Sequence, residues 1–156
     1  HTEVREVTIS KTLHLIGPGF MLAENNINTI NPGEATFVYT VRFSKENCSV
    51  SGCVFLHGAS LGVSCTAKNN KFANNVSFDN NVYFGGNVVV NGNINVGSHY
   101  YNIVVENNII MGKATAGMGS WRDCIFRNNT FVTSASGELV SDMINCSIYN
   151  NIITQM

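Results

Sequence analysis

One short pattern of apolar and polar positions recurs along the chain from Cys48 to the C-terminus. Each copy has an apolar or cysteine residue, any residue, an apolar residue, any residue, two small polar residues that are mostly Asn-Asn, any residue and an apolar residue. The copies are Cys48–Phe55, Cys65–Phe72, Val76–Tyr83, Ile103–Ile110, Cys124–Phe131, Cys146–Ile153 and a weaker one, Val88–Asn95. An internal repeat of this kind predicts a solenoid, in which each copy is a structural unit stacked on the next.

Each copy predicts a strand, a sharp turn and a second strand. Its first half alternates apolar and polar residues, which is the period of a β-strand, and the Asn pair interrupts that alternation. Asn adopts the left-handed backbone conformation more readily than other residues except Gly, and Gly52 and Gly92 stand in place of the first Asn of their pairs. Stacked turns would also let each Asn amide bond to its equivalent in the next coil. The sequence therefore predicts an all-β fold, a parallel β-helix with Asn-rich turns.

The spacing of the copies leaves the width of the coils open. The intervals between first positions are 17, 11, 12, 15, 21 and 22 residues. The last two fit one wide coil each. The steps of 11 and 12 residues after Cys65 fit either a pattern that occurs twice within one coil or a narrower helix, and the first option is favoured. An irregular excursion is expected from Met21 to Ala35.

A wide-coiled, single-stranded β-helix resembles the right-handed parallel β-helix of the pectin-lyase-like superfamily. The segment from Val7 to Asn25, which contains Leu-His-Leu-Ile-Gly-Pro-Gly-Phe, is similar to one common in secreted β-helix proteins of Bacteroidetes. The resemblance covers nearly the whole chain and implies a secreted or cell-surface protein whose signal peptide has been removed. In that family a strand and a Gly-rich turn precede the segment, so the single domain of residues 1–156 is expected to lack an N-terminal coil or cap.

The composition fits one domain and argues against some partners. The chain has 156 residues, of which 44% are hydrophobic and 12% charged, which suffices to fill a core. Its net charge is −1, and the lysines and arginines are scattered without the basic stripe that nucleic-acid binding needs. No apolar run reaches the roughly 18 residues of a membrane span. We therefore expect neither a nucleic-acid partner nor a membrane-spanning segment.

The cysteines are predicted to be small core residues. Cys48, Cys65, Cys124 and Cys146 occupy the first position of the pattern, which Val76, Val88 and Ile103 fill in other copies. Adjacent coils lie about 4.8 Å apart, so Cys124 and Cys146 are the pair that could be bonded. The chain has no CxxC motif, and its four histidines are dispersed. No metal site and no cofactor are therefore expected.

Catalysis on acidic polysaccharides is one functional hypothesis for this fold. Lyases of the superfamily need carboxylates to hold calcium and an Arg or Lys base, and its hydrolases need two or three close Asp residues. The aspartates here, Asp79, Asp123 and Asp142, are well separated in the sequence. The segments Gly-His-Gly and Arg-x-Lys of polygalacturonases are absent. The enzyme hypothesis is therefore the alternative rather than the favoured interpretation.

Ligand binding without catalysis is the favoured hypothesis. Two excursions between copies, Met111–Asp123 and Val132–Ile144, are expected to lie side by side, because a solenoid gathers its insertions on one face. Trp121 could stack on a sugar ring while Arg122 and Asp123 orient it, and His99 and Tyr100 form a second candidate cluster. The alternative role of Trp121 is to cover the edge of the core.

A purely structural role is the third hypothesis. The last copy ends at Ile152-Ile153-Thr-Gln-Met156, and no polar segment follows to cover the final coil. Open β-helix ends expose strand edges that can pair with another chain. Self-association through these ends is therefore considered beside the favoured role, which is adhesion or carbohydrate binding.

Overall fold

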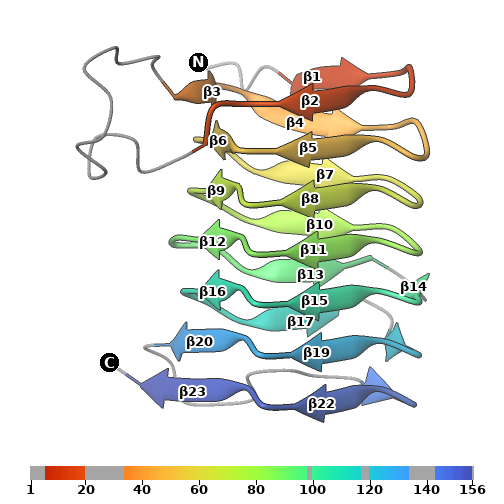
Figure 1. The fold of residues 1–156 in the computed structure, drawn as a ribbon. Coiled ribbons are helices and arrows are strands. Elements are labelled where there is room, and N and C mark those ends of the chain that lie inside the picture. The colour runs from red at the N-terminus through yellow and green to blue at the C-terminus, as the bar shows by residue number, and fades with distance from the viewer. Residues whose placement is uncertain (1–5, 20–33, 98–99, 117–119, 134–142, 156) are drawn as a thin grey trace, which may run out of the picture.

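The computed structural model describes residues 6–19, 34–97, 100–116, 120–133 and 143–155, and all regular elements among them are β-strands. The strands pair in parallel and wind around one axis. As the chain descends in Figure 1, strands run leftward at the front and rightward behind them, so the coil is right-handed. The prediction of an all-β, single-stranded right-handed parallel β-helix is confirmed. The expected excursion from Met21 lies outside the described residues up to position 33.

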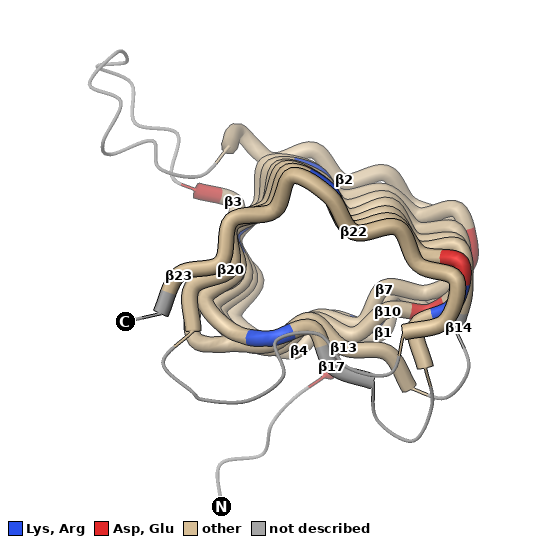
Figure 2. The backbone as a smooth tube through the Cα atoms, turned by 90° about the horizontal axis from the view of Figure 1, so that it is seen from below, with Lys and Arg blue, Asp and Glu red and all other residues tan. Residues whose placement is uncertain are grey.

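Three long sheets form the walls of the solenoid, and seen along the axis the coils superimpose (Figure 2). Sheet A contains β1 (Glu6–Ile9), β4 (Thr40–Phe43), β7 (Ala59–Leu61), β10 (Val76–Phe78), β13 (Ile94–Val96) and β17 (Ala114–Ala116). Sheet B contains β2 (His14–Ile16), β5 (Ser49–Ser51), β8 (Thr66–Lys68), β11 (Tyr83–Gly85), β15 (Val104–Glu106), β19 (Ile125–Arg127) and β22 (Ser147–Tyr149). Sheet C contains β3 (Ala35–Phe37), β6 (Cys53–Phe55), β9 (Lys71–Phe72), β12 (Val88–Val89), β16 (Ile109–Ile110), β20 (Thr130–Thr133) and β23 (Ile152–Gln155).

A fourth sheet widens the later coils. Sheet D consists of β14 (Tyr100–Tyr101), β18 (Trp121–Arg122) and β21 (Met143–Ile144), which lie between sheets A and B along the chain. Before it, equivalent residues of successive coils are 17 apart, as for Asn70 and Asn87. Beyond it they are 21 or 22 apart, as for Asn87 and Asn108 or Asn129 and Asn151. The extra residues therefore build one more wall segment.

The copies of the repeat do not all lie on the same face. The Cys65 copy begins on sheet B, whereas the Val76 copy begins on sheet A and the Val88 copy on sheet C. The pattern thus recurs within a coil, as expected. The coil itself is the narrower one, however, because Val82 and not Val88 is equivalent to Cys65 one coil later.

The corners depend on left-handed residues. Those at the corners flanking sheet B are Asn47, Ser64, Asn81, Asn102, Asp123 and Asn145 before it, and Gly52, Asn69, Gly86, Asn107, Asn128 and Asn150 after it, with φ between 53° and 68°. The prediction for Gly52 is confirmed. The prediction for Gly92 is wrong, since Asn91 takes the positive φ of 58° at that turn. Gly92 is required for space, because a Cβ there would lie 2.4 Å from the Asn74 backbone carbon.

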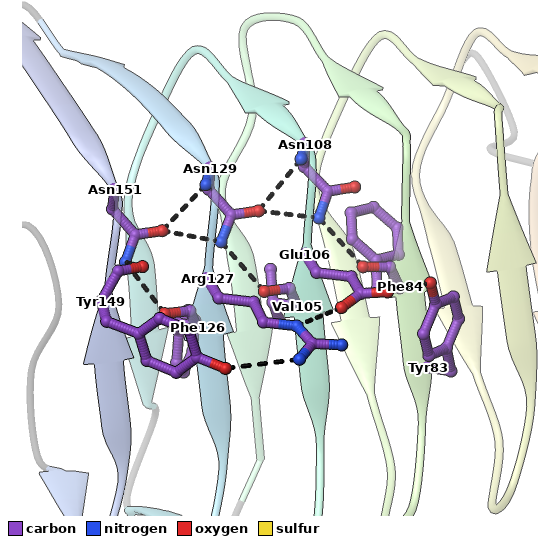
Figure 3. A network of polar contacts seen from close by, with 10 residues as sticks. All are labelled: Tyr83, Phe84, Val105, Glu106, Asn108, Phe126, Arg127, Asn129, Tyr149 and Asn151. Carbon is purple, nitrogen blue, oxygen red and sulfur yellow. Dashed lines mark hydrogen bonds and ion pairs between the residues drawn. The ribbon is translucent and has the colours of Figure 1, made fainter.

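The second Asn of each pair forms a buried ladder inside the corner between sheets B and C. Its members are Asn70, Asn87, Asn108, Asn129 and Asn151. Each side-chain oxygen accepts the backbone N–H of the preceding member, at 2.9 Å for Asn70 and 2.8 Å for Asn87. Each amide nitrogen after Asn70 also donates to a carbonyl of the coil above, as Asn108 does to Phe84 at 2.9 Å (Figure 3). The predicted Asn ladder is therefore present.

The core is filled by columns of like residues. On sheet C, Phe37, Phe55 and Phe72 stack with ring centroids 4.8 and 4.7 Å apart. The column that precedes sheet B contains Cys48, Cys65, Val82, Ile103 and Cys124, all buried, and the half-buried Cys146. All five cysteines are free thiols. The prediction that the repeat cysteines act as core residues is confirmed. The described residues also include no helix long and apolar enough to cross a membrane.

Candidate functional site

A row of polar and aromatic side chains runs along the outer face of sheet B, parallel to the solenoid axis. The third residue of each strand points outward, and register aligns these residues in a column of Lys68, Gly85, Glu106, Arg127 and Tyr149. Tyr83, the first residue of β11, points outward as well because its neighbour Phe84 is buried. We call Lys68, Tyr83, Glu106, Arg127 and Tyr149 the sheet B row.

Four of these side chains form one connected network (Figure 3). The Tyr83 hydroxyl donates to Oε1 of Glu106, and Nε of Arg127 donates to its Oε2. Nη1 of Arg127 donates to the Tyr149 hydroxyl at 3.3 Å. The network spans four consecutive coils and is held by the parallel register of β11, β15, β19 and β22.

The network fixes the charge state of its members. Hydrogen bonds from Tyr83 and Arg127 lower the pKa of Glu106. Burial, reinforced by the bond to Glu106, raises the pKa of Tyr83 to about 12. Bonds to Tyr149 and Glu106 raise the pKa of Arg127 further. At neutral pH the row therefore presents a carboxylate, a guanidinium and neutral phenols.

The Tyr83 ring lies flat against the sheet because Gly85 leaves room for it. A Cβ at Gly85 would come within 2.6 Å of the Tyr83 Cε1 and Oη atoms. The Lys68 ammonium lies 4.8 Å from the ring centroid, a cation–π distance. Gly85 is thus part of the site through the space that it leaves.

The arrangement offers binding groups to a polar ligand. The Arg127 side chain is 40% exposed, and the bonds described use two of its five N–H groups. Tyr149 is 43% exposed, so it adds an aromatic surface and a hydroxyl. Glu106, by contrast, is 12% exposed and has both oxygens engaged. Glu106 therefore serves to position Tyr83 and Arg127.

A cavity of about 300 Å³ lies at the corner between sheets A and B. It is lined by Arg42, Phe43, Ser44, Lys45, Glu46, Ser60, Gly62, Val63 and Asp79. Its four charged side chains form no ion pair with one another, within the described ranges. Two are basic and two acidic, so the cavity favours no sign of ligand charge, and it lacks an exposed aromatic ring.

The two candidate clusters predicted from the sequence meet in sheet D. Tyr100 pairs with Trp121 and Tyr101 with Arg122 across the parallel strands β14 and β18. His99 lies outside the described residues, as does the Tyr100 side chain. The two expected excursions are largely wall rather than loop, because β17, β18, the end of β20 and β21 lie within them.

Trp121 itself faces the core. Its side chain is 0% exposed and makes edge contacts with Phe78 at 6.1 Å and Phe126 at 5.1 Å between ring centroids. The sugar-stacking role predicted for Trp121 is not compatible with this burial, whereas the alternative role in the core is. Arg122 and Asp123 are exposed, and Nε of Arg122 donates to Ser120 Oγ at 3.0 Å.

The sequence analysis missed the sheet B row although the repeat contained its signal. Lys68, Glu106, Arg127 and Tyr149 each directly precede an Asn-Asn pair, at a position treated as variable. Aligned by coil, that position gives a column of charged and aromatic residues on one face. Comparison of the chain with protein-family models, with curated proteins and with solved structures gave no significant match.

Proposed function

We propose that this chain is a secreted or cell-surface β-helix protein that binds glycans without catalysis, as part of adhesion. The sheet B row is the binding surface. The observation that supports the proposal is the fixed display of Tyr83, Arg127 and Tyr149 along the solenoid axis. The wide-coiled fold and the resemblance to pectin-lyase-like proteins of Bacteroidetes favour the same class of ligand.

The chemistry of the row suits sugars. Aromatic faces pack against the apolar faces of sugar rings, while planar donors and phenols bond to hydroxyls. The groups sit on strands rather than loops and are held by one another, so little side-chain entropy is lost on binding. A linear ligand that lies along the axis could contact several coils at once.

The charge state of Glu106 argues for binding rather than hydrolysis at this row. A glycosidase acid needs a carboxyl whose pKa is raised, so that it carries a proton at neutral pH. The pKa of Glu106 is lowered by its bonds to Tyr83 and Arg127. Its ionised carboxylate cannot donate the proton that a leaving sugar requires.

The test is electrophoresis of the native protein through gels that contain plant, host or microbial polysaccharides, followed by staining for loss of polymer. We expect at least one polymer to slow the protein without being cleared. Arg127→Ala should abolish the retardation, whereas Arg122→Ala, a surface arginine on sheet D, should not. Equal retardation of the two variants would place the binding surface elsewhere, and clearing of the polymer would favour the lyase or hydrolase alternative.

Self-association is a second candidate function, supported by the outermost coil of the described residues. Ile148 and Ile153 stand in the inward columns of Phe126 and Phe131, yet they are 54% and 64% exposed. Their exposed strands β22 and β23 could pair with another chain. Sedimentation of the protein over a range of concentrations tests this role, since Ile153→Lys should lower the association constant if the coil is an interface.

A further inference from the structure

Four of the five cysteines stand as two stacked pairs. In sheet B, Ser49 pairs with Thr66 and Ile125 with Ser147, so the residues just before them, Cys48 with Cys65 and Cys124 with Cys146, are neighbours on adjacent coils. Backbone bonds of 2.9 Å from Thr66 N to Cys48 O and 2.8 Å from Ser147 N to Cys124 O hold this register.

The spacing of the pairs suits a covalent bond. Adjacent strands lie about 4.8 Å apart, within the range of roughly 4.4–6.8 Å between the Cα atoms of a disulfide. The thiols of each pair are close enough that, beside burial, each neighbour contributes to raising the pKa of Cys65 and of Cys124 to about 11. Proximity and register thus coincide at both pairs.

The fifth cysteine provides an internal control. Cys53 begins β6 in sheet C, where it pairs with Ala35, and its backbone N–H donates to Asn70 Oδ1 at 3.0 Å. Strand β5 separates it from Cys48. The fold therefore gives Cys53 no cysteine on a neighbouring rung.

We propose that the solenoid carries two redox-active cysteine pairs, Cys48 with Cys65 and Cys124 with Cys146, which oxidise to disulfides that bridge adjacent coils and leave Cys53 free. The oxidant is a small disulfide such as oxidised glutathione. One protein thiolate attacks it and releases one glutathione thiolate, and the second cysteine then displaces the other. Each bond therefore consumes one oxidised glutathione, yields two reduced glutathione molecules and takes two hydrogen atoms from the protein. This inference does not rest on glycan binding.

The two pairs differ in access, which predicts their order of reaction. Cys146 is half-buried, whereas Cys48, Cys65 and Cys124 are at most 2% exposed. Thiolate attack needs both ionisation and exposure, so Cys146 reacts first in the folded protein. Bonding of Cys48 to Cys65 follows more slowly, because it waits for a local opening of the coil.

The experiment is refolding of the full chain in a glutathione redox buffer until the thiol content is constant, then acid quenching, unfolding and labelling with N-ethylmaleimide. Intact mass should show five labels for the reduced protein and one for the oxidised protein, and peptide mapping should place that one on Cys53. Oxidised Cys53→Ser should take no label. Oxidised Cys124→Ser should take two, on Cys53 and Cys146.

The wild-type count and linkage decide the matter without any variant. One label on Cys53, with Cys48 linked to Cys65 and Cys124 to Cys146, supports the inference. Any other label count at constant thiol content, or any linkage that includes Cys53, overturns it. A time course on the folded protein adds the order of reaction, and loss of the Cys48 and Cys65 labels before those of Cys124 and Cys146 would refute the argument from access.

Discussion

Replacing Asn108 by alanine tests whether the buried ladder holds the coils together. The Asn108 side chain is 2% exposed, and its Oδ1 accepts the Asn87 backbone N–H at 2.8 Å. Its Nδ2 donates to the Phe84 carbonyl at 2.9 Å. Asn108→Ala therefore removes the partner of one buried N–H and a donor to one buried carbonyl. At about 1–3 kcal/mol for each buried group left unpaired, the expected loss of unfolding free energy is about 2–6 kcal/mol.

The preceding residue is a matched control in the same Asn-Asn pair. Asn107 is exposed and has a φ of 56°. Asn107→Ala should cost only about 1 kcal/mol, the strain of a left-handed alanine. Asn107→Gly should be close to neutral, because glycine adopts that conformation freely. Asn108→Gly, however, should be at least as damaging as Asn108→Ala, since glycine restores none of the lost bonds.

Urea unfolding followed by circular dichroism would give the free energies of the four variants. A loss of about 2–6 kcal/mol is a large share of the roughly 5–15 kcal/mol by which a domain is stable, so the Asn108 variants should unfold at clearly lower urea. Equal costs for Asn107→Ala and Asn108→Ala would refute the reasoning, because the two positions would then not have separate roles.

Three further predictions concern the sheet B row and the core. Gly85→Ala should push the Tyr83 ring away from the sheet and break its bond to Glu106; ultraviolet titration would then show the pKa of Tyr83 falling from about 12 toward 10, and an unchanged titration would contradict the close approach. Because the pKa of Glu106 is lowered on folding, its carboxylate stabilises the fold above the ordinary pKa of 4.5, and this contribution is lost as the pH falls through the folded-state value. The stability difference between wild type and Glu106→Gln should therefore shrink on acidification below 4.5, and a constant difference in urea titrations would count against the network. Trp121 should emit at short wavelength and resist acrylamide quenching until the protein unfolds, whereas strong quenching in the folded state would show that the ring is accessible.

Part of the architecture could be predicted because the repeat carries it locally. Alternation makes strands and the Asn pair makes a corner, whatever lies on the neighbouring coil. The first Asn supplies a left-handed residue, as at Asn69 and Asn128, and the second supplies an amide for the ladder, as at Asn70. Both roles follow from the chemistry of one residue type at two adjacent positions, so the sequence predicted the fold class and the ladder.

The location of each copy could not be predicted in the same way. Val76 and Val88 carry the pattern of Cys65, yet they lie on sheets A and C, because a coil here takes 17 residues and its corners resemble one another. The turn at Gly92 was assigned wrongly for the same reason, since Asn91 provides the left-handed residue there. Which copies share a face depends on how many residues close a coil, and that number is a property of the stacked walls.

The sequence by itself determined that this chain winds into a parallel β-helix with apolar columns inside and Asn-rich corners. Only the tertiary structure decided which side chains meet. Glu106 and Arg127 are 21 residues apart and become partners because their strands are in register, whereas Trp121, a surface candidate from its neighbours, fills the core that sheet D widens. Local chemistry specifies a strand or a turn, but a contact between coils depends on register, which the accumulated length of the intervening corners sets.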